Sequence, residues 1–194
     1  MTASATLEMP SETTTRNRPA TAPLGCDRIL LTGFMGSGKT TVGGELAKCL
    51  GWAFHDLDSE IELRDGRSVP RIFAESGEAH FRRLESTALA SLLGQRKIVL
   101  ALGGGAPEEL GNRLLIEQTP RTEVVYLSAP LPTLVERCNR QAKTGESALR
   151  PLLGEAEERF RTRHPIYERI AGHRIGTSTL TVDEVVAAVL KTLA

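Results

Sequence analysis

The stretch Gly33-Phe-Met-Gly-Ser-Gly-Lys-Thr40 decides the fold, because it fills every fixed position of the phosphate-loop pattern G-x-x-x-x-G-K-[S/T]. It stands between an apolar run at 28–32, which predicts a buried strand, and a segment at 40–50 with apolar residues at helical spacing. Glycines let the backbone curl so that successive N–H groups face phosphate oxygens, and the helix start adds its positive dipole end. A chance glycine turn is the alternative, and the flanking strand and helix argue against it.

Within this loop, the residue types predict separate tasks in binding a nucleotide. Lys39 is expected to neutralise charge on the β- and γ-phosphates, and the hydroxyl of Thr40 is placed to bind Mg²⁺. The predicted nucleotide-binding residues of the loop are Gly36, Ser37, Gly38, Lys39, Thr40 and Thr41.

Outward from the loop, short β-rich runs alternate with longer helical segments. Further strands are predicted at 52–57, 97–102, 123–127 and 174–177, and helices at 59–64, 69–75, 78–93, 108–117, 132–140, a stretch ending at 171, and 182–193. Such alternation requires parallel strands with helices on both faces. The predicted fold is therefore a three-layer α/β/α sandwich around a parallel sheet of about five strands. Residues 141–153 are polar and irregular, and are expected to form a lid.

The composition of the 194-residue chain is that of an ordinary globular protein, with 40% hydrophobic and 25% charged residues. Lys and Arg equal Asp and Glu, 24 against 24, so no overall basic bias points to nucleic acid or a membrane surface. Residues 1–25 are rich in Thr and Pro, and are expected to form a disordered tail before a domain at 26–194. Three distant cysteines and the lack of a secretory apolar segment favour the cytoplasm.

A phosphate loop alone does not separate a kinase from a GTPase or an ATPase. The chain lacks the N-K-x-D motif with which GTPases read guanine, and it is too short for a large ATPase module. A small-metabolite kinase needs less: a carboxylate for the metal, an acid at the acceptor, and cations around the transferred phosphoryl group.

Two carboxylates, Asp56 and Asp58, stand at the end of the second predicted strand. Residues two apart in an extended chain share a face, so both are expected to face the crevice at the carboxyl ends of the strands. The third strand ends without an acid, which makes Asp56 the best candidate to support hydrated Mg²⁺. The alternative for Asp58 is a simple helix N-cap.

Three glycines and several arginines complete the candidate site. Gly103-Gly-Gly105 follows the third strand, where it would allow a ligand to approach the backbone or would merely form a flexible turn. The arginines of interest are Arg82, Arg140, Arg150 and Arg163. A lone arginine is usually solvated, but several that converge on one crevice would fit an anionic substrate.

With these motifs in order, the chain resembles the shikimate kinase family from Arg28 to Ala194. The matching segments are 33–43 (GFMGSGKTTVG), 56–61 (DLDSEI), 72–78 (IFAESGE), 81–85 (FRRLE), 102–106 (LGGGA), 125–127 (VYL), 150–153 (RPLL) and 163–167 (RHPIY). The resemblance implies the nucleoside-monophosphate-kinase fold with strand order 2-3-1-4-5. It also implies ATP-dependent phosphorylation of the shikimate 3-hydroxyl, a step of aromatic amino-acid biosynthesis.

The resemblance also implies a role for each site residue. Asp58, Arg82, Gly104 and Arg163 would hold shikimate, with the two arginines on its carboxylate and Asp58 on its ring hydroxyls. Asp56 would support Mg²⁺ through water beside Thr40; Arg150 would reach the phosphoryl group from the lid; Arg140 would lie near the adenine. Lys39, Asp58 and Arg150 are thus the expected catalytic residues.

The expected partners are ATP and shikimate, with no nucleic acid and no membrane, and the protein is expected to be a monomer. A gluconate kinase of the same architecture is the closest alternative, and a nucleotide-binding regulator that has lost catalysis is a second.

Overall fold

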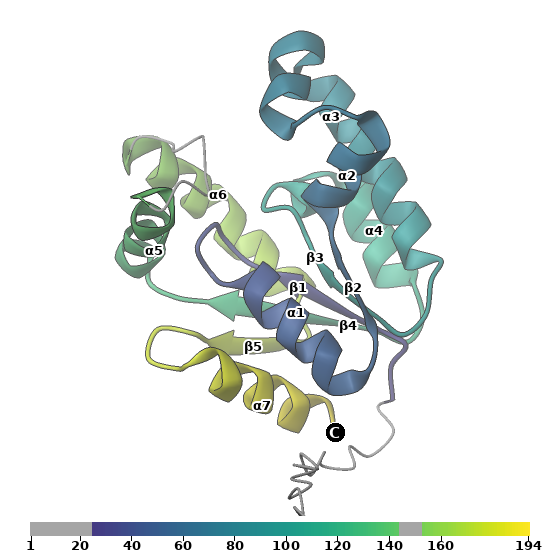
Figure 1. Cartoon of the computed structure of the whole chain (residues 1–194), viewed down its shortest axis with the longest axis vertical. Coiled ribbons are helices and arrows are strands. Elements are labelled where there is room, and N and C mark those ends of the chain that lie inside the picture. The colour runs from purple at the N-terminus through teal and green to yellow at the C-terminus, as the bar shows by residue number, and fades with distance from the viewer. Residues whose placement is uncertain (1–24, 144–152) are drawn as a thin grey trace, which may run out of the picture.

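The computed structural model describes residues 25–143 and 153–194, and in them five strands form one parallel sheet (Figure 1). The order is β2-β3-β1-β4-β5, as expected. The strands are β1 (Arg28–Thr32), β2 (Ala53–Asp56), β3 (Ile98–Ala101), β4 (Thr122–Ser128) and β5 (His173–Gly176). The predicted fold class is confirmed. The predicted N-terminal tail lies almost wholly outside the described residues.

Seven α-helices and one 3-10 turn are present in the described residues. They are α1 (Lys39–Leu50), α2 (Leu57–Asp65), α3 (Val69–Leu93), η1 (Ala106–Glu108), α4 (Leu110–Gln118), α5 (Leu131–Lys143), α6 (Leu153–Ile170) and α7 (Val182–Leu193). The two helices predicted at 69–75 and 78–93 are the two parts of α3, which bends at Gly77 with φ 76°. Because α5 continues to Lys143, the first residues of the predicted lid are helical; 144–152 lie outside the described residues.

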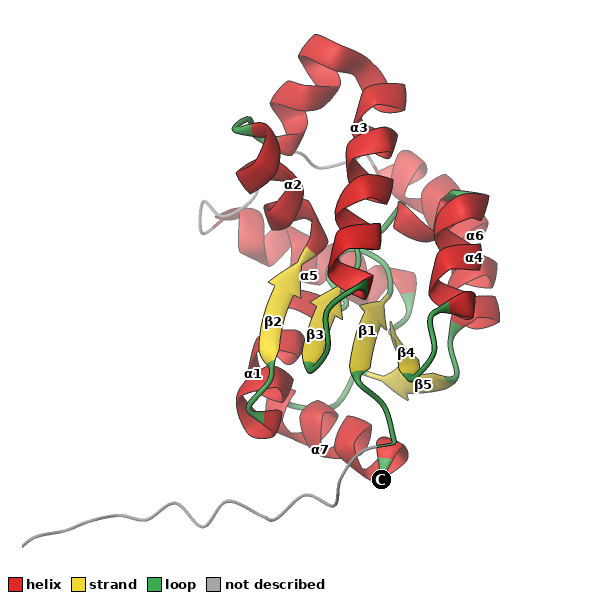
Figure 2. Cartoon of the chain, turned by 90° about the vertical axis from the view of Figure 1, so that its right-hand side faces the viewer, coloured by secondary structure: helices red, strands yellow, loops and turns green. Residues whose placement is uncertain are grey.

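Alternate strand residues bury their side chains on opposite faces of the sheet, and Figure 2 shows the helices that cover these faces. Leu30, Leu100 and Val124 pack with the helices α2, α3 and α4. Ile29, Val99 and Val125 pack on the other face with α1 and α7. Burial on both faces explains why the central strands are continuous apolar runs rather than alternating ones.

The carboxyl ends of the parallel strands meet at one edge of the sheet, and α2 and the first part of α3 project beyond this edge (Figure 2). The phosphate loop follows β1, Asp56 ends β2, and the glycine triplet follows β3. The fold therefore gathers the predicted site at the edge where open α/β sheets bind ligands. No helix in the two described ranges is long and apolar enough to cross a membrane.

Candidate active site

The phosphate loop has the curled backbone that its glycines permit. Gly36 and Gly38 have φ values of 75° and 92°, which side chains disfavour. The ammonium of Lys39 donates hydrogen bonds to the carbonyl oxygens of Gly33 (2.8 Å) and Phe34 (3.1 Å). Lys39 therefore lies inside the curve of the loop, where a phosphate group would contact it.

Lys39 shares its surroundings with two carboxylates. Burial lowers the pKa of its ammonium, because removal from water disfavours the charged form. The carboxylates of Asp58 and Asp56 act in the opposite direction and favour the charged form. The loop's cation thus lies within electrostatic reach of both predicted acidic residues.

Thr40 and Asp56 form the pair that could hold a metal ion. The Thr40 hydroxyl donates to Oδ2 of Asp56 at 2.8 Å, and Oδ1 of Asp56 accepts from the backbone N–H groups of Asp58 (3.2 Å) and Ser59 (3.3 Å). These oxygens suit Mg²⁺, which commonly takes one or two carboxylates and completes its shell with water and substrate phosphates. Residues 25–143 and 153–194 contain no cluster of three His, Cys, Asp or Glu that could hold a metal. The protein would therefore supply only part of the ligands of a bound Mg²⁺, and water and phosphates the rest.

The expectation that Asp56 and Asp58 project from one extended strand is wrong. Strand β2 ends at Asp56, and Asp58 lies in the first turn of α2. The helix cap is Asp56 rather than Asp58, because its carboxylate accepts the first free N–H groups of the helix. Burial, followed by the charge of Asp56, raises the pKa of Asp58, and Lys39 partly offsets this effect.

Each glycine of the triplet faces a different predicted acceptor residue. A Cβ atom on Gly103 would lie 2.7 Å from Oδ1 of Asp58, and one on Gly104 would lie 3.4 Å from Nη1 of Arg163. A Cβ atom on Gly105 would lie 2.7 Å from both terminal nitrogens of Arg82. The triplet therefore lets the protein's own side chains approach the backbone closely, whereas the prediction was that a ligand would do so.

Arg82 on α3 and Arg163 on α6 both reach this triplet. Arg82 donates to Glu85 (2.8 Å) and Glu78 (3.0 Å), and the Glu85 side chain is only 1% exposed. The Nε of Arg163 donates to Oε2 of Glu108 at 3.0 Å. Sequence reasoning missed Glu85 and Glu108, and only the pair Arg82–Glu85, three residues apart on a helix, carries a local signal.

A cavity of about 520 Å³ joins the phosphate loop to the acceptor residues. Its lining comprises Met35, Gly36, Gly38, Lys39, Thr40, Thr41, Asp56, Asp58, Leu102, Gly104 and Arg163. Arg82 does not line this cavity but lies against Gly105 beside it. Arg150 lies outside the described residues. The loop, the Thr40–Asp56 pair and three of the four predicted acceptor residues, Asp58, Gly104 and Arg163, thus meet in one space.

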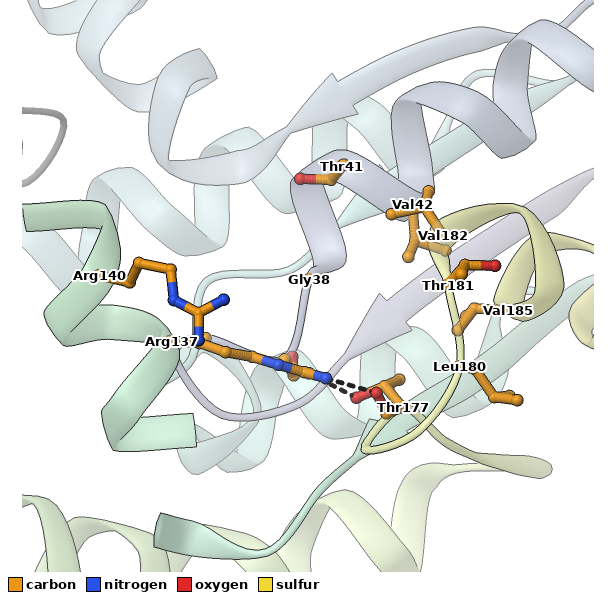
Figure 3. A pocket seen from close by; sticks show the side chains of 12 residues that line it. Gly38, Thr41, Val42, Arg137, Arg140, Thr177, Leu180, Thr181, Val182 and Val185 are labelled. Carbon is orange, nitrogen blue, oxygen red and sulfur yellow. Dashed lines mark hydrogen bonds between the residues drawn. The ribbon is translucent and has the colours of Figure 1, made fainter. Parts of the chain in front are cut away.

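A second cavity, of about 350 Å³, lies across the phosphate loop (Figure 3). Its lining includes the apolar side chains Val42, Leu180, Val182 and Val185. Gly36, Gly38 and Thr41 line both cavities, so the loop forms the wall between them. Apolar surface next to a phosphate loop suits the flat face of a nucleotide base.

Two arginines of α5 line this second cavity, and they differ in how they are held. Arg137 donates to the Thr177 hydroxyl at 3.0 Å and to the Thr177 carbonyl oxygen, which fixes its guanidinium group (Figure 3). Arg140, the residue expected near the adenine, is exposed and pairs with Glu136 at 2.9 Å. Sequence reasoning missed Arg137, although its position three residues before Arg140 places both on one side of the helix.

Known proteins resemble this chain in sequence and in fold. A shikimate kinase family profile matches residues 35–194. The shikimate kinase of Bordetella avium is 41% identical over 171 residues, which cover 85% of this chain and 78% of that protein. The shikimate kinase of Methylococcus capsulatus is 43% identical over 155 residues, 77% of this chain and 82% of that protein.

Solved structures lead to the same family. Shikimate kinase from Acinetobacter baumannii in complex with shikimate has a TM-score of 0.78 and 34% identity, and the match covers 86% of this chain and 92% of that one. A gluconokinase from Sinorhizobium meliloti 1021 has a TM-score of 0.59 and 20% identity over 88% of this chain and 93% of that one, so it shares the fold alone. The chain belongs to the shikimate kinase family.

Proposed function

We propose that this protein transfers the γ-phosphoryl group of ATP to the 3-hydroxyl of shikimate, as a step of chorismate and aromatic amino-acid biosynthesis. The observation that carries the proposal is the cavity in which Lys39, the Thr40–Asp56 pair, Asp58 and Arg163 meet. Donor and acceptor groups therefore surround a single space, as an in-line phosphoryl transfer requires.

On the donor side, the phosphate loop would hold the ATP phosphates through its backbone N–H groups and Lys39. Thr40 and Asp56 would hold Mg²⁺, whose charge offsets that of the phosphates. Arg137 would contact the base in the second cavity beside Arg140, because Thr177 fixes its guanidinium there. Arg150, in the segment expected to form a lid, would reach the transferred phosphoryl group.

On the acceptor side, Arg82 and Arg163 would bind the carboxylate of shikimate, since guanidinium groups match carboxylates in a bidentate geometry. The backbone of Gly104 would contact the substrate between them. Asp58 would orient the 3-hydroxyl and accept its proton as the new O–P bond forms and the bond to the leaving ADP breaks. Burial raises the pKa of Asp58 and so makes it the stronger base.

A coupled assay of ADP release tests this proposal against the alternatives. Shikimate should give acceptor-dependent turnover, whereas gluconate should give little above the background without acceptor. Preference for gluconate would favour the other kinase, and no acceptor-dependent release would favour a regulator. We also propose a monomer that works in the cytoplasm; light scattering after size exclusion measures the former, and cell fractionation the latter.

A further inference from the structure

Glu108 occupies a fixed position beside the proposed acceptor site. It is the last residue of η1, the 3-10 turn that follows the glycine triplet. Asn112 donates to the carbonyl oxygen of Ala106 at 2.9 Å, and Arg113 donates to those of Pro107 and Glu108, each at 2.7 Å. Helix α4 therefore fixes the backbone of this turn, and with it the point from which the Glu108 side chain extends.

One oxygen of this carboxylate lies between the two acceptor arginines. Oε2 of Glu108 is 2.8 Å from Nη2 and 3.0 Å from Nε of Arg163, and 3.8 Å from Nη2 of Arg82. The two arginine side chains are 14% and 15% exposed, and that of Glu108 is 29% exposed. The contact is thus partly shielded from water, and the Glu108 side chain still has a route to solvent.

In this geometry, Glu108 and an incoming carboxylate compete for the same edge of the Arg163 guanidinium. Nε and Nη2 form one of the two-pronged edges that a guanidinium offers to a carboxylate, and in Arg163 that edge is bound to Glu108. Arg82 is already paired with Glu85 and Glu78. A second carboxylate on the same guanidinium groups would lie close to the negative charge of Glu108, and the repulsion disfavours binding of both carboxylates at once.

We propose that Glu108 is a specificity-determining residue that competes with the acceptor's carboxylate for Arg163 and so raises the KM for shikimate. The inference rests on the proposed assignment of Arg82 and Arg163 to that carboxylate. On acceptor binding, Glu108 gives up its contact with Arg163 and turns toward solvent. Only acceptors with a negative charge at this position gain enough from Arg163 to replace it.

The test is Glu108→Gln, which removes the charge and keeps the shape. The KM for shikimate should fall about three- to tenfold, between the small effect of an exposed ion pair and the larger effect of a buried one. The kcat and the KM for ATP should stay unchanged, and the KM for the uncharged methyl ester of shikimate should not fall. Glu109→Gln is the matched control, since Glu109 is the exposed neighbour, and it should leave all values unchanged.

Arg163→Ala separates failure of this inference from failure of the acceptor site. If Arg163→Ala leaves the KM for shikimate unchanged, the acceptor assignment itself is wrong. If Arg163→Ala raises that KM while Glu108→Gln leaves it unchanged or raises it, only the competition is refuted. In the Arg163→Ala background, Glu108→Gln should lose its effect, because the coupling requires both partners. Glu108→Ala, measured alongside, should lower the KM in the same direction as Glu108→Gln.

Discussion

Replacing Gly103 with alanine tests whether the proposed chemistry depends on the position of the Asp58 carboxylate. The new Cβ would lie 2.7 Å from Oδ1 of Asp58 and 3.1 Å from Oε1 of Glu85. An unstrained contact between a carbon and an oxygen needs roughly 3.4 Å, a little less than two carbons require, so the Asp58 oxygen must retreat by about 0.7 Å. The φ of Gly103 lies outside the left-handed region, so the backbone itself accepts alanine.

A displacement of this size should reduce the rate of the chemical step. A misplacement of about 1 Å can cost roughly 100-fold in rate, so Gly103→Ala should lower kcat about 10- to 100-fold. Steady-state ADP release at saturating shikimate and ATP measures this value, and thermal unfolding checks that the variant folds. Gly111→Ala is the control, because nothing lies within 4 Å of a Cβ at that position on α4. A wild-type kcat in Gly103→Ala would refute the reasoning.

Gly105→Ala gives the matched contrast within the same triplet. Its Cβ would lie 2.7 Å from both terminal nitrogens of Arg82, a residue assigned to binding rather than to chemistry. The same Cβ would lie 2.9 Å from Oε2 of Glu108, so the comparison is made in the Glu108→Gln background. There the KM for shikimate should rise about tenfold, a loss of about 1.4 kcal/mol, with a smaller change in kcat. If both alanine variants change the same kinetic parameter, the separate roles of Asp58 and Arg82 are wrong.

Three further substitutions address the other residues of the site. Lys39→Ala should nearly abolish turnover while the protein still folds, and wild-type rates would contradict the phosphate-loop assignment. Asp58→Asn should lower kcat strongly. It should also raise the melting temperature at pH 8 more than at pH 4. Burial raises the pKa of Asp58 in the folded state, so the contribution of Asp58 to folding stability is fully present below its unfolded-state pKa and is lost as pH rises through its folded-state pKa. At pH 8 the buried carboxylate is therefore a cost that asparagine removes. Arg137→Ala should raise the KM for ATP about tenfold and more than Arg140→Ala does; equal effects would reject the preference for Arg137.

The parts of the site that are local in sequence could be predicted, and the phosphate loop is the clearest case. Its glycines, Lys39 and Thr40 act within a single turn between a strand and a helix, so their spacing alone fixes their arrangement. The sheet order, in contrast, was expected from the family resemblance and not from periodicity. Asp58 lines the cavity beside the phosphate loop, but the local reason given for this was wrong, since α2 begins at Leu57, two residues earlier than expected.

The residues that sequence reasoning missed depend on contacts between distant elements. Arg137 differs from Arg140 because its guanidinium donates to Thr177, 40 residues away, and this contact depends on where α5 lies relative to the residue that follows β5. Glu108 contacts Arg163 across 55 residues. A lone acid after a glycine triplet carries no local signal of such a partner, and only the packing of α6 on η1 brings the two together.

The wall shared by the two cavities limits which substitutions could make this protein resistant to an inhibitor. A compound in either cavity would touch main-chain atoms of Gly36 and Gly38, which have no side chain to alter. A Cβ on Gly36 would lie 2.5 Å from the carbonyl oxygen of Leu134, and both glycines have left-handed backbone conformations. Drug-resistant variants at these two positions would therefore distort the loop that the enzyme itself needs.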